Sequence, residues 1–160
     1  THLLADSAMH IGNLTDDKTF LIQINDVNLR LLMLKNNEMD ALLLPEPQAT
    51  KARLMNNKVL IDSREMDVRL GVLAFCPPKD SLISEQIDKF LVAYKQACDT
   101  IDKYGLSRYS NIISDYCGIE RTVVDSISKE LKFATEQNPR KVDVERVKNW
   151  YKNSTDYAIK

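Results

Sequence analysis

The chain has 160 residues, of which 44% are hydrophobic and 28% charged, and its formal net charge is −1. A chain of this size can bury a core without disulfide or metal cross-links, and its near-neutral charge gives no electrostatic reason to bind nucleic acid. No apolar run approaches the roughly 20 residues that a membrane-spanning helix needs.

The cysteines and the first residue give further information on the class of protein. Cys76, Cys98 and Cys117 form no CxxC pair. An odd number at these spacings indicates neither a disulfide framework nor a zinc site, so we expect buried free thiols, with a Cys98–Cys117 disulfide as the alternative. The chain carries no signal peptide but starts at Thr1 rather than Met, so we expect that an upstream part was removed or not included.

The first part of the chain alternates between two hydrophobic patterns. Apolar residues at three- and four-residue steps predict helices, and short apolar runs bounded by turn or proline signals predict strands. Helices are expected at residues 1–13, 26–37 and 48–55, and strands at 19–24, 39–44 and 58–61. This alternation predicts an α/β fold with parallel strands.

The second part of the chain is mostly helical in pattern. Residues 63–68 are charged and polar, and we expect a boundary between two lobes there. A fourth strand is expected at 69–76, before two prolines. Helices are then expected at 84–104, 107–117, 119–131 and 142–152. The helix at 84–104 has the clearest periodicity, with apolar side chains at Ile87, Phe90, Leu91, Tyr94, Cys98 and Ile101.

The loop Pro45-Glu46-Pro47 is the first candidate site. It follows the predicted strand 39–44, and ligands usually bind beyond the carboxyl ends of strands in an open α/β sheet. Glu46 lies between two prolines that stiffen the backbone. Its carboxylate could accept hydrogen bonds from a ligand amine or ring N–H, and the alternative is a solvated loop carboxylate.

Two other polar groups have both a functional and a structural interpretation. Asn25 and Asp26 follow the strand 19–24 and could contact a ligand, but their position favours a role as helix caps. Ser63, Arg64 and Arg69 flank the expected boundary, where an arginine could pair with an anionic ligand. Hinge or surface charges are the more common role for such residues.

Metal and cofactor chemistry have little support in the sequence. His2 and His10 are the only histidines, and no carboxylate or cysteine accompanies them at metal-ligand spacing. We therefore expect surface histidines and no metal site. The chain also has only four glycines and no glycine-rich phosphate loop, so no cofactor is expected.

A series of motifs resembles a known family. An Asn-Glu-Met-Asp-Ala turn at 37–41 precedes Pro-Glu-Pro at 45–47 and Leu-Ile-Asp-Ser-Arg-Glu at 60–65. Gly-Val-Leu-Ala-Phe at 71–75 and a helix of the type Ile-x-x-Phe-Leu-x-Ala-Tyr at 87–94 follow. In this order the motifs resemble the later part of a type II periplasmic solute-binding protein, of the branch that serves ABC transporters for sulfonates, nitrate and thiamine precursors.

The resemblance implies an architecture of two α/β lobes joined by crossing strands, with the ligand in the cleft between them. Residues 1–62 would form part of the second lobe, 63–68 the crossover, and 69–160 the return strand and helices of the first lobe. The family's N-terminal half is absent, so we expect either a fragment, or a fold whose missing part comes from another chain or from a second copy in a homodimer. The resemblance also implies a periplasmic or lipid-anchored location outside the cytoplasm, and the membrane permease of the transporter as partner.

The implied function is that of a solute-binding component of an ABC uptake transporter. It would close around a small organic ligand without catalysing a reaction. The expected ligand-binding residues are Asn25, Asp26, Pro45, Glu46, Pro47, Ser63 and Arg64. The alternatives are an enzyme of thiamine-pyrimidine or menaquinone biosynthesis on the same fold, and a ligand-sensing domain.

Overall fold

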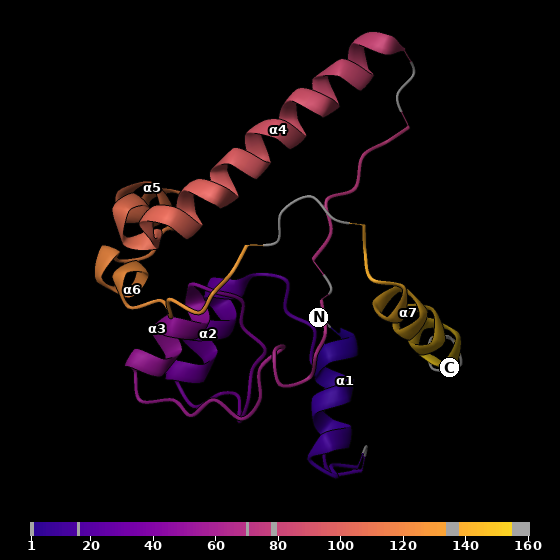
Figure 1. Ribbon diagram of the computed structural model, residues 1–160. Helices are drawn as coiled ribbons and strands as arrows, with labels where there is room; N and C mark the ends of the chain where they lie inside the picture. Colours follow the sequence, from indigo (N-terminus) through magenta and orange to yellow (C-terminus); the bar gives the residue numbers. More distant parts are fainter. Residues whose placement is uncertain (1, 16, 70, 78–79, 134–137, 155–160) are drawn as a thin grey trace. The chain divides into compact units, whose positions relative to one another are not determined.

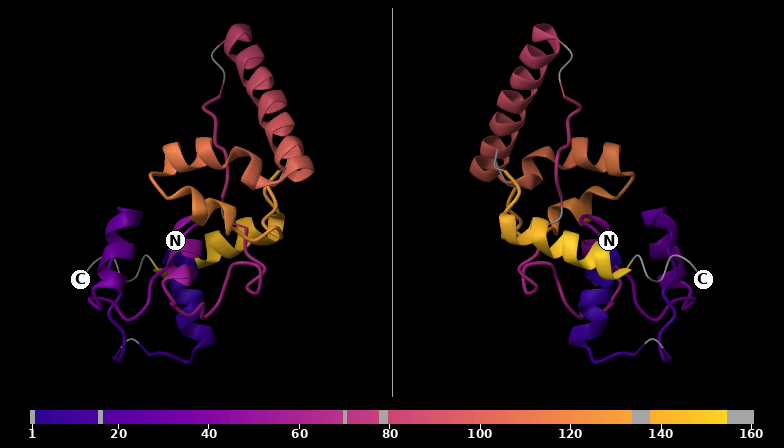
Figure 2. Two further views of the ribbon diagram at one scale, coloured as in Figure 1. Left: turned by 90° about the vertical axis from the view of Figure 1, so that its left-hand side faces the viewer. Right: turned by 90° about the vertical axis from the view of Figure 1, so that its right-hand side faces the viewer.

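The computed structural model describes residues 2–15, 17–69, 71–77, 80–133 and 138–154. The chain divides into two compact units. Unit 1 consists of Thr1–Arg69 together with Arg140–Lys160, and unit 2 consists of Leu70–Pro139. Figures 1 and 2 show the helices of each unit.

The described residues of unit 1 form four helices: α1 (His2–Ile11), α2 (Val27–Lys35), α3 (Gln48–Leu54) and α7 (Lys141–Ser154). Helix α2 begins after Asp26, whose side chain accepts the first free backbone N–H groups of the helix. Helices α2 and α3 pack together, and Leu31 and Ala52 are buried. Helix α7 returns from the far end of the sequence to complete this unit.

Unit 2 contains α4 (Ser81–Tyr104), the 3-10 helix η1 (Leu106–Tyr109), α5 (Ser110–Cys117) and α6 (Arg121–Asp125). Its core consists of Ile119, Val123 and Val124, against which Ile113, Cys117 and Ile127 pack. Gly118 ends α5 with a φ of +59°, a left-handed conformation that glycine adopts without a steric penalty. This turn reverses the chain and brings α6 against α5.

The predicted α/β fold is wrong, because no strand forms in the part of the chain that the structure describes. The described residues of the four segments expected as strands form no regular structure, and several of the side chains expected to pack between sheet and helix are exposed. Phe20 is 91% exposed, Leu60 72% and Val72 63%. The type II periplasmic-binding-protein-like lobes that the resemblance implied are therefore also wrong. A short apolar run of β-branched and aromatic residues favours a pleated, half-buried strand. The strand forms only if another segment pairs with it, and the run itself does not show whether one does.

The helix predictions agree better with the structure. Helices occur in every region where one was expected, although α4 begins at Ser81 with Asp80 as its cap, ahead of the expected Ser84. The predicted helix 119–131 is shortened to α6, because Ser126 and Ile127 bond back only to Val123 and Val124 and do not continue the α-helical pattern.

The cysteines and the helix lengths complete the description. All three cysteines are free thiols, so the alternative Cys98–Cys117 disulfide does not form. Cys98 is buried and Cys117 half-buried, but Cys76 is exposed, against the expectation that all three are buried. Among the described helices, α4 included, none combines the length and the hydrophobicity needed to cross a bilayer.

Candidate functional site

The loop at Pro45–Pro47 is joined to α3 by its own glutamate. Glu46 Oε2 accepts the backbone N–H of Thr50 at 3.0 Å, and Glu46 Oε1 lies 3.3 Å from Arg53 Nη2. The same Arg53 nitrogen donates to Thr50 Oγ1 at 2.6 Å, and Thr50 is only 2% exposed. The carboxylate thus satisfies an unpaired N–H of the first turn of α3 and holds Arg53 against it. In this arrangement the hydrogen-bonding capacity of Glu46 serves the helix.

Asn25 and Asp26 also make local contacts. Asp26 Oδ1 accepts the backbone N–H groups of Asn28 at 2.8 Å and Leu29 at 3.0 Å, which is the geometry of a helix cap. Asn25 Oδ1 accepts from Gln23 Nε2 at 3.2 Å. These hydrogen bonds position the start of α2.

Arg64 is paired with Asp62 in the turn at 63–67. Asp62 Oδ2 accepts from Arg64 Nη2 at 2.7 Å and from Nε at 3.1 Å, and Oδ1 accepts the backbone N–H of Arg64 at 2.8 Å. This forked pair and the backbone N–H groups lower the pKa of Asp62 from 3.8 to about 2. The arginine proposed to meet an anionic ligand therefore already has a carboxylate partner, and the neighbouring Ser63 is exposed.

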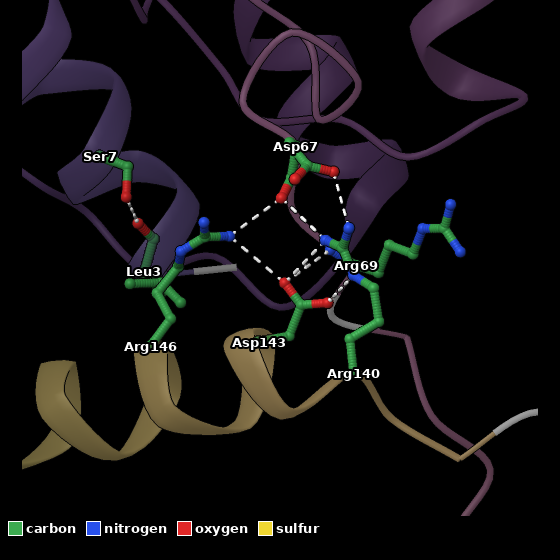
Figure 3. A network of polar contacts seen from close by, with 7 residues as sticks. All are labelled: Leu3, Ser7, Asp67, Arg69, Arg140, Asp143 and Arg146. Atoms are coloured by element: carbon green, nitrogen blue, oxygen red, sulfur yellow. Dashed lines mark hydrogen bonds and ion pairs between the residues drawn. The ribbon is translucent and has the colours of Figure 1, made fainter.

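The same turn is fastened to α7 by a charged network that the sequence analysis missed (Figure 3). Its centre is Asp143, which is 3% exposed. Arg140 Nε donates to Asp143 Oδ2 at 2.6 Å and Arg140 Nη2 to Oδ1 at 3.0 Å. On the other side of the carboxylate, Arg146 Nη1 donates to Oδ1 at 3.3 Å. One buried carboxylate thus has two arginine partners, Arg146 in α7 and Arg140 directly before the helix.

Asp67 connects this network to the turn. Its carboxylate accepts from Arg140 Nη1 at 2.8 Å, and its backbone carbonyl accepts from Arg140 Nη2 at 2.9 Å and Arg146 Nη1 at 3.0 Å. The guanidinium of Arg69, another predicted candidate, points away from the network in Figure 3, although its backbone N–H faces Asp143 Oδ1 at 3.5 Å. The Arg-x-x-Asp-x-x-Arg spacing at 140–146 was the available sequence signal, since residues three apart share a helix face.

The opposite charges in this network lower the pKa of the carboxyl group and raise the pKa of the guanidinium group. Hydrogen bonds from Arg140 lower the pKa of the Asp143 carboxyl, and Asp143 and Asp67 together raise the pKa of Arg140. Both groups are therefore charged near neutral pH. The network stabilises the junction between α7 and the turn at 63–67. The guanidinium groups of Arg140 and Arg146 donate to oxygens of Asp143 and Asp67.

A second contact joins α7 to α1. Trp150 Nε1 donates to Asp6 Oδ2 at 2.6 Å, and His2 Nε2 lies 3.5 Å from Asp6 Oδ1. The rings of His2 and Trp150 are tilted with centroids 5.4 Å apart. Over the residues described, no three His, Cys, Asp or Glu side chains are grouped so that they could hold a metal ion.

Unit 2 contains an apolar pocket between α4, η1 and α5. Its volume is about 340 Å³, and it is lined by Gln96, Ala97, Thr100, Ile101, Tyr109, Ile112 and Ile113. These residues come together because Gly105 ends α4 and turns the chain back through η1 into α5. The lining residues carry no formal charge, and the Thr100 hydroxyl donates to the backbone carbonyl of Gln96.

The sequence analysis identified Ile101 only as a helix-face residue, because a pocket depends on how two helices meet. Comparisons of the chain with protein-family models, curated proteins and solved structures found no match.

Proposed function

We propose that this chain is a small-molecule-binding protein and that the apolar pocket of unit 2 is its ligand site. The observation that carries the proposal is the pocket itself. Its volume of about 340 Å³ lies at the small end of the range found for ligand pockets, roughly 300–1,000 Å³. Its walls are mainly aliphatic, as such sites usually are, and it is open to solvent at Ile112, which is 57% exposed.

The lining residues define the class of ligand. Ile101, Ile112 and Ile113 offer aliphatic contact, and the Tyr109 ring adds an aromatic surface. The surface that the pocket presents is almost entirely apolar. An anionic ligand would find no cation among these residues, and burying an unpaired charge is costly. The ligand is therefore an uncharged, mainly apolar molecule, such as a small aromatic ring.

Small-molecule binding is the part of the sequence-based prediction that the pocket supports. The role in an ABC uptake system, the permease partner and the location outside the cytoplasm stay predictions from the sequence. So do the alternatives of a biosynthetic enzyme and a ligand-sensing domain. Sulfonate and nitrate, the anions suggested by the resemblance, are a poor match to this neutral pocket.

A thermal-shift experiment tests the proposal with two probes. Indole is uncharged, aromatic and carries one N–H donor, whereas butanesulfonate is an anion with a similar apolar part. We expect indole at millimolar concentration to raise the unfolding temperature, because a ligand that binds only the folded state stabilises it. Butanesulfonate should have little effect. The absence of stabilisation by indole would contradict the proposal.

Two matched variants locate the effect. Ala97→Leu places a larger side chain in the pocket and should abolish the indole shift. Ala93→Leu makes the same change one turn earlier on α4, outside the pocket lining, and should retain the shift. An equal response of the two variants would show that indole binds elsewhere.

A further inference from the structure

Ser110 occupies the junction between the 3-10 helix η1 and α5, and it is buried, at 1% exposed. Its Oγ donates to the Ser107 carbonyl at 2.9 Å and accepts the Nε–H of Arg121 at 3.1 Å. A serine hydroxyl has one hydrogen to donate and lone pairs to accept with, so both kinds of capacity are used here. Because Ser107 belongs to η1 and Arg121 is the first residue of α6, this hydroxyl ties the two elements together.

The hydrogen bonds of η1 itself give this junction little rigidity. A 3-10 helix has poorer hydrogen-bond geometry than an α-helix, and η1 is only four residues long. Within the described chain, no side chain caps the start of η1, after Gly105, or the start of α5, after Tyr109. The hydroxyl of Ser110 is therefore the side-chain group that fixes where η1 meets α5.

Arg121 connects this junction to the apolar core of unit 2. It begins α6, whose Val123 and Val124 are 5% and 1% exposed in that core. Figure 1 shows α6 beside α5, and η1 also packs against α6. Because close-packed side chains hold the α6 backbone, the Arg121 side chain starts from a fixed point. Its Nε–H then holds Ser110, 11 residues earlier in the sequence.

The same junction carries one wall of the apolar pocket. Tyr109 directly precedes Ser110, and Ile112 and Ile113 follow it within α5, and these three residues line the pocket. Ser110 lies among them in the sequence without being part of the lining. A displacement of Ser110 would therefore move the Tyr109 ring and the two isoleucines relative to α4, which supplies the opposite wall.

We infer that Ser110 and Arg121 are positioning residues for the ligand. Their hydrogen bond holds Tyr109 and the isoleucines of α5 in the arrangement that a small aromatic ligand requires. The inference rests on the proposed function, since it concerns the same pocket. A preorganised site binds more tightly, because less of the protein has to be ordered when the ligand enters. Ligand affinity therefore depends on a hydrogen bond whose two partners lie outside the pocket lining.

Two substitutions of Arg121, an exposed residue, test this hydrogen bond. In Arg121→Gln the amide nitrogen stands as many bonds from the backbone as the arginine Nε did, so a donor to Ser110 Oγ is retained. Arg121→Met places a methyl group there and removes the same charge. We expect Arg121→Gln to bind indole like the wild type. Arg121→Met should bind it roughly fivefold more weakly in a titration, the factor equivalent to one ordinary hydrogen bond.

Ser126→Ala is the matched control. The Ser126 hydroxyl also donates to a backbone carbonyl, that of Thr122, but neither residue lines the pocket. Its loss should leave the indole affinity unchanged. A loss of affinity as large as in Arg121→Met would overturn the inference, because it would show a general response of α6.

The other outcomes separate this inference from the proposed function. Equal affinities of Arg121→Gln and Arg121→Met, whether unchanged or weakened, would overturn the inference and leave the ligand site in place. A wild type that does not bind indole would contradict the proposed function and the inference with it. Circular dichroism checks that each variant is folded. If Arg121→Met is not, Ser110→Ala removes the acceptor instead and should weaken indole binding at least as much.

Discussion

The contacts that stabilise unit 1 internally differ in kind from those that stabilise unit 2. Unit 1 depends on polar contacts between distant segments: Arg140 with Asp67, and Trp150 with Asp6. Unit 2 depends on the apolar cluster of Ile119, Val123 and Val124. The polar side chains predicted as a binding site lie in unit 1 and are engaged with the protein. The apolar pocket, which is open to an occupant, lies in unit 2.

The largest expected effect is in the polar unit. Asp143→Ala removes the buried carboxylate that holds Arg140 and Arg146 in position against Asp67, and this weakens the tie between α7 and the turn at 63–67. We expect a larger loss of stability than from any other change described below. Trp150 is the only tryptophan and belongs to unit 1, so its fluorescence during denaturant unfolding reports on this unit.

A matched control separates this network from ordinary surface charge. Asp99→Ala removes an exposed partner of Lys95 on α4 and should cost at most about 0.5 kcal/mol. If the Trp150 transition is unchanged in Asp143→Ala, the network does not hold unit 1 together.

Acid should also affect the two units differently. The pKa of Asp62 is about 2 in the folded chain instead of 3.8, and the pKa of Asp143 is also lowered. A carboxyl with a lowered folded pKa stabilises the fold above its unfolded pKa, and this stabilisation is lost as the pH falls through the folded value. Unit 1 should therefore weaken from about pH 4 downwards.

Fluorescence and circular dichroism followed together measure this difference. The Trp150 signal should change at a higher pH than the helical signal, part of which comes from the long helix α4. Coincident changes of the two signals would argue against separate responses of the units.

The core of unit 2 predicts the next largest effect. Val124 is 1% exposed in the apolar cluster, and Val124→Ala removes buried methyl groups and leaves a cavity. The expected cost is about 2 kcal/mol. It should appear in the helical signal and leave the Trp150 transition nearly unchanged. A shift of both transitions by the same amount would contradict the division into two independently held units.

Apart from that of the Asp99 control, the smallest expected loss of stability comes from substitutions of Asp26, which test whether this residue caps α2 or contacts a ligand. Asp26→Ala should destabilise α2 by about 1 kcal/mol, and Asp26→Ser should restore most of the loss, because serine also caps helices well. Indole binding, measured by titration, should be the same in both variants. A weaker indole affinity in both would instead place Asp26 at the ligand site.

The sequence was sufficient for features that depend on neighbours in the chain. Periodicity located the helical regions, and Asp26 and Gly118 cap their helices because caps are local. The strands were predicted wrongly, since a run such as 19–24 shows a preference for extended backbone but not whether another segment pairs with it. The Asp67–Arg140 contact joins residues far apart in the sequence, and no local pattern contains it.

The most direct test of where this chain binds its ligand is a methyl NMR titration with indole, using isoleucine labels. Ile101, Ile112 and Ile113 line the pocket, whereas Ile24 and Ile61 belong to unit 1. The proposal predicts that the signals of the first three shift with a common affinity and that those of Ile24 and Ile61 do not. Shifts confined to Ile24 and Ile61, with the three pocket signals unchanged, would place the site in unit 1 and contradict it.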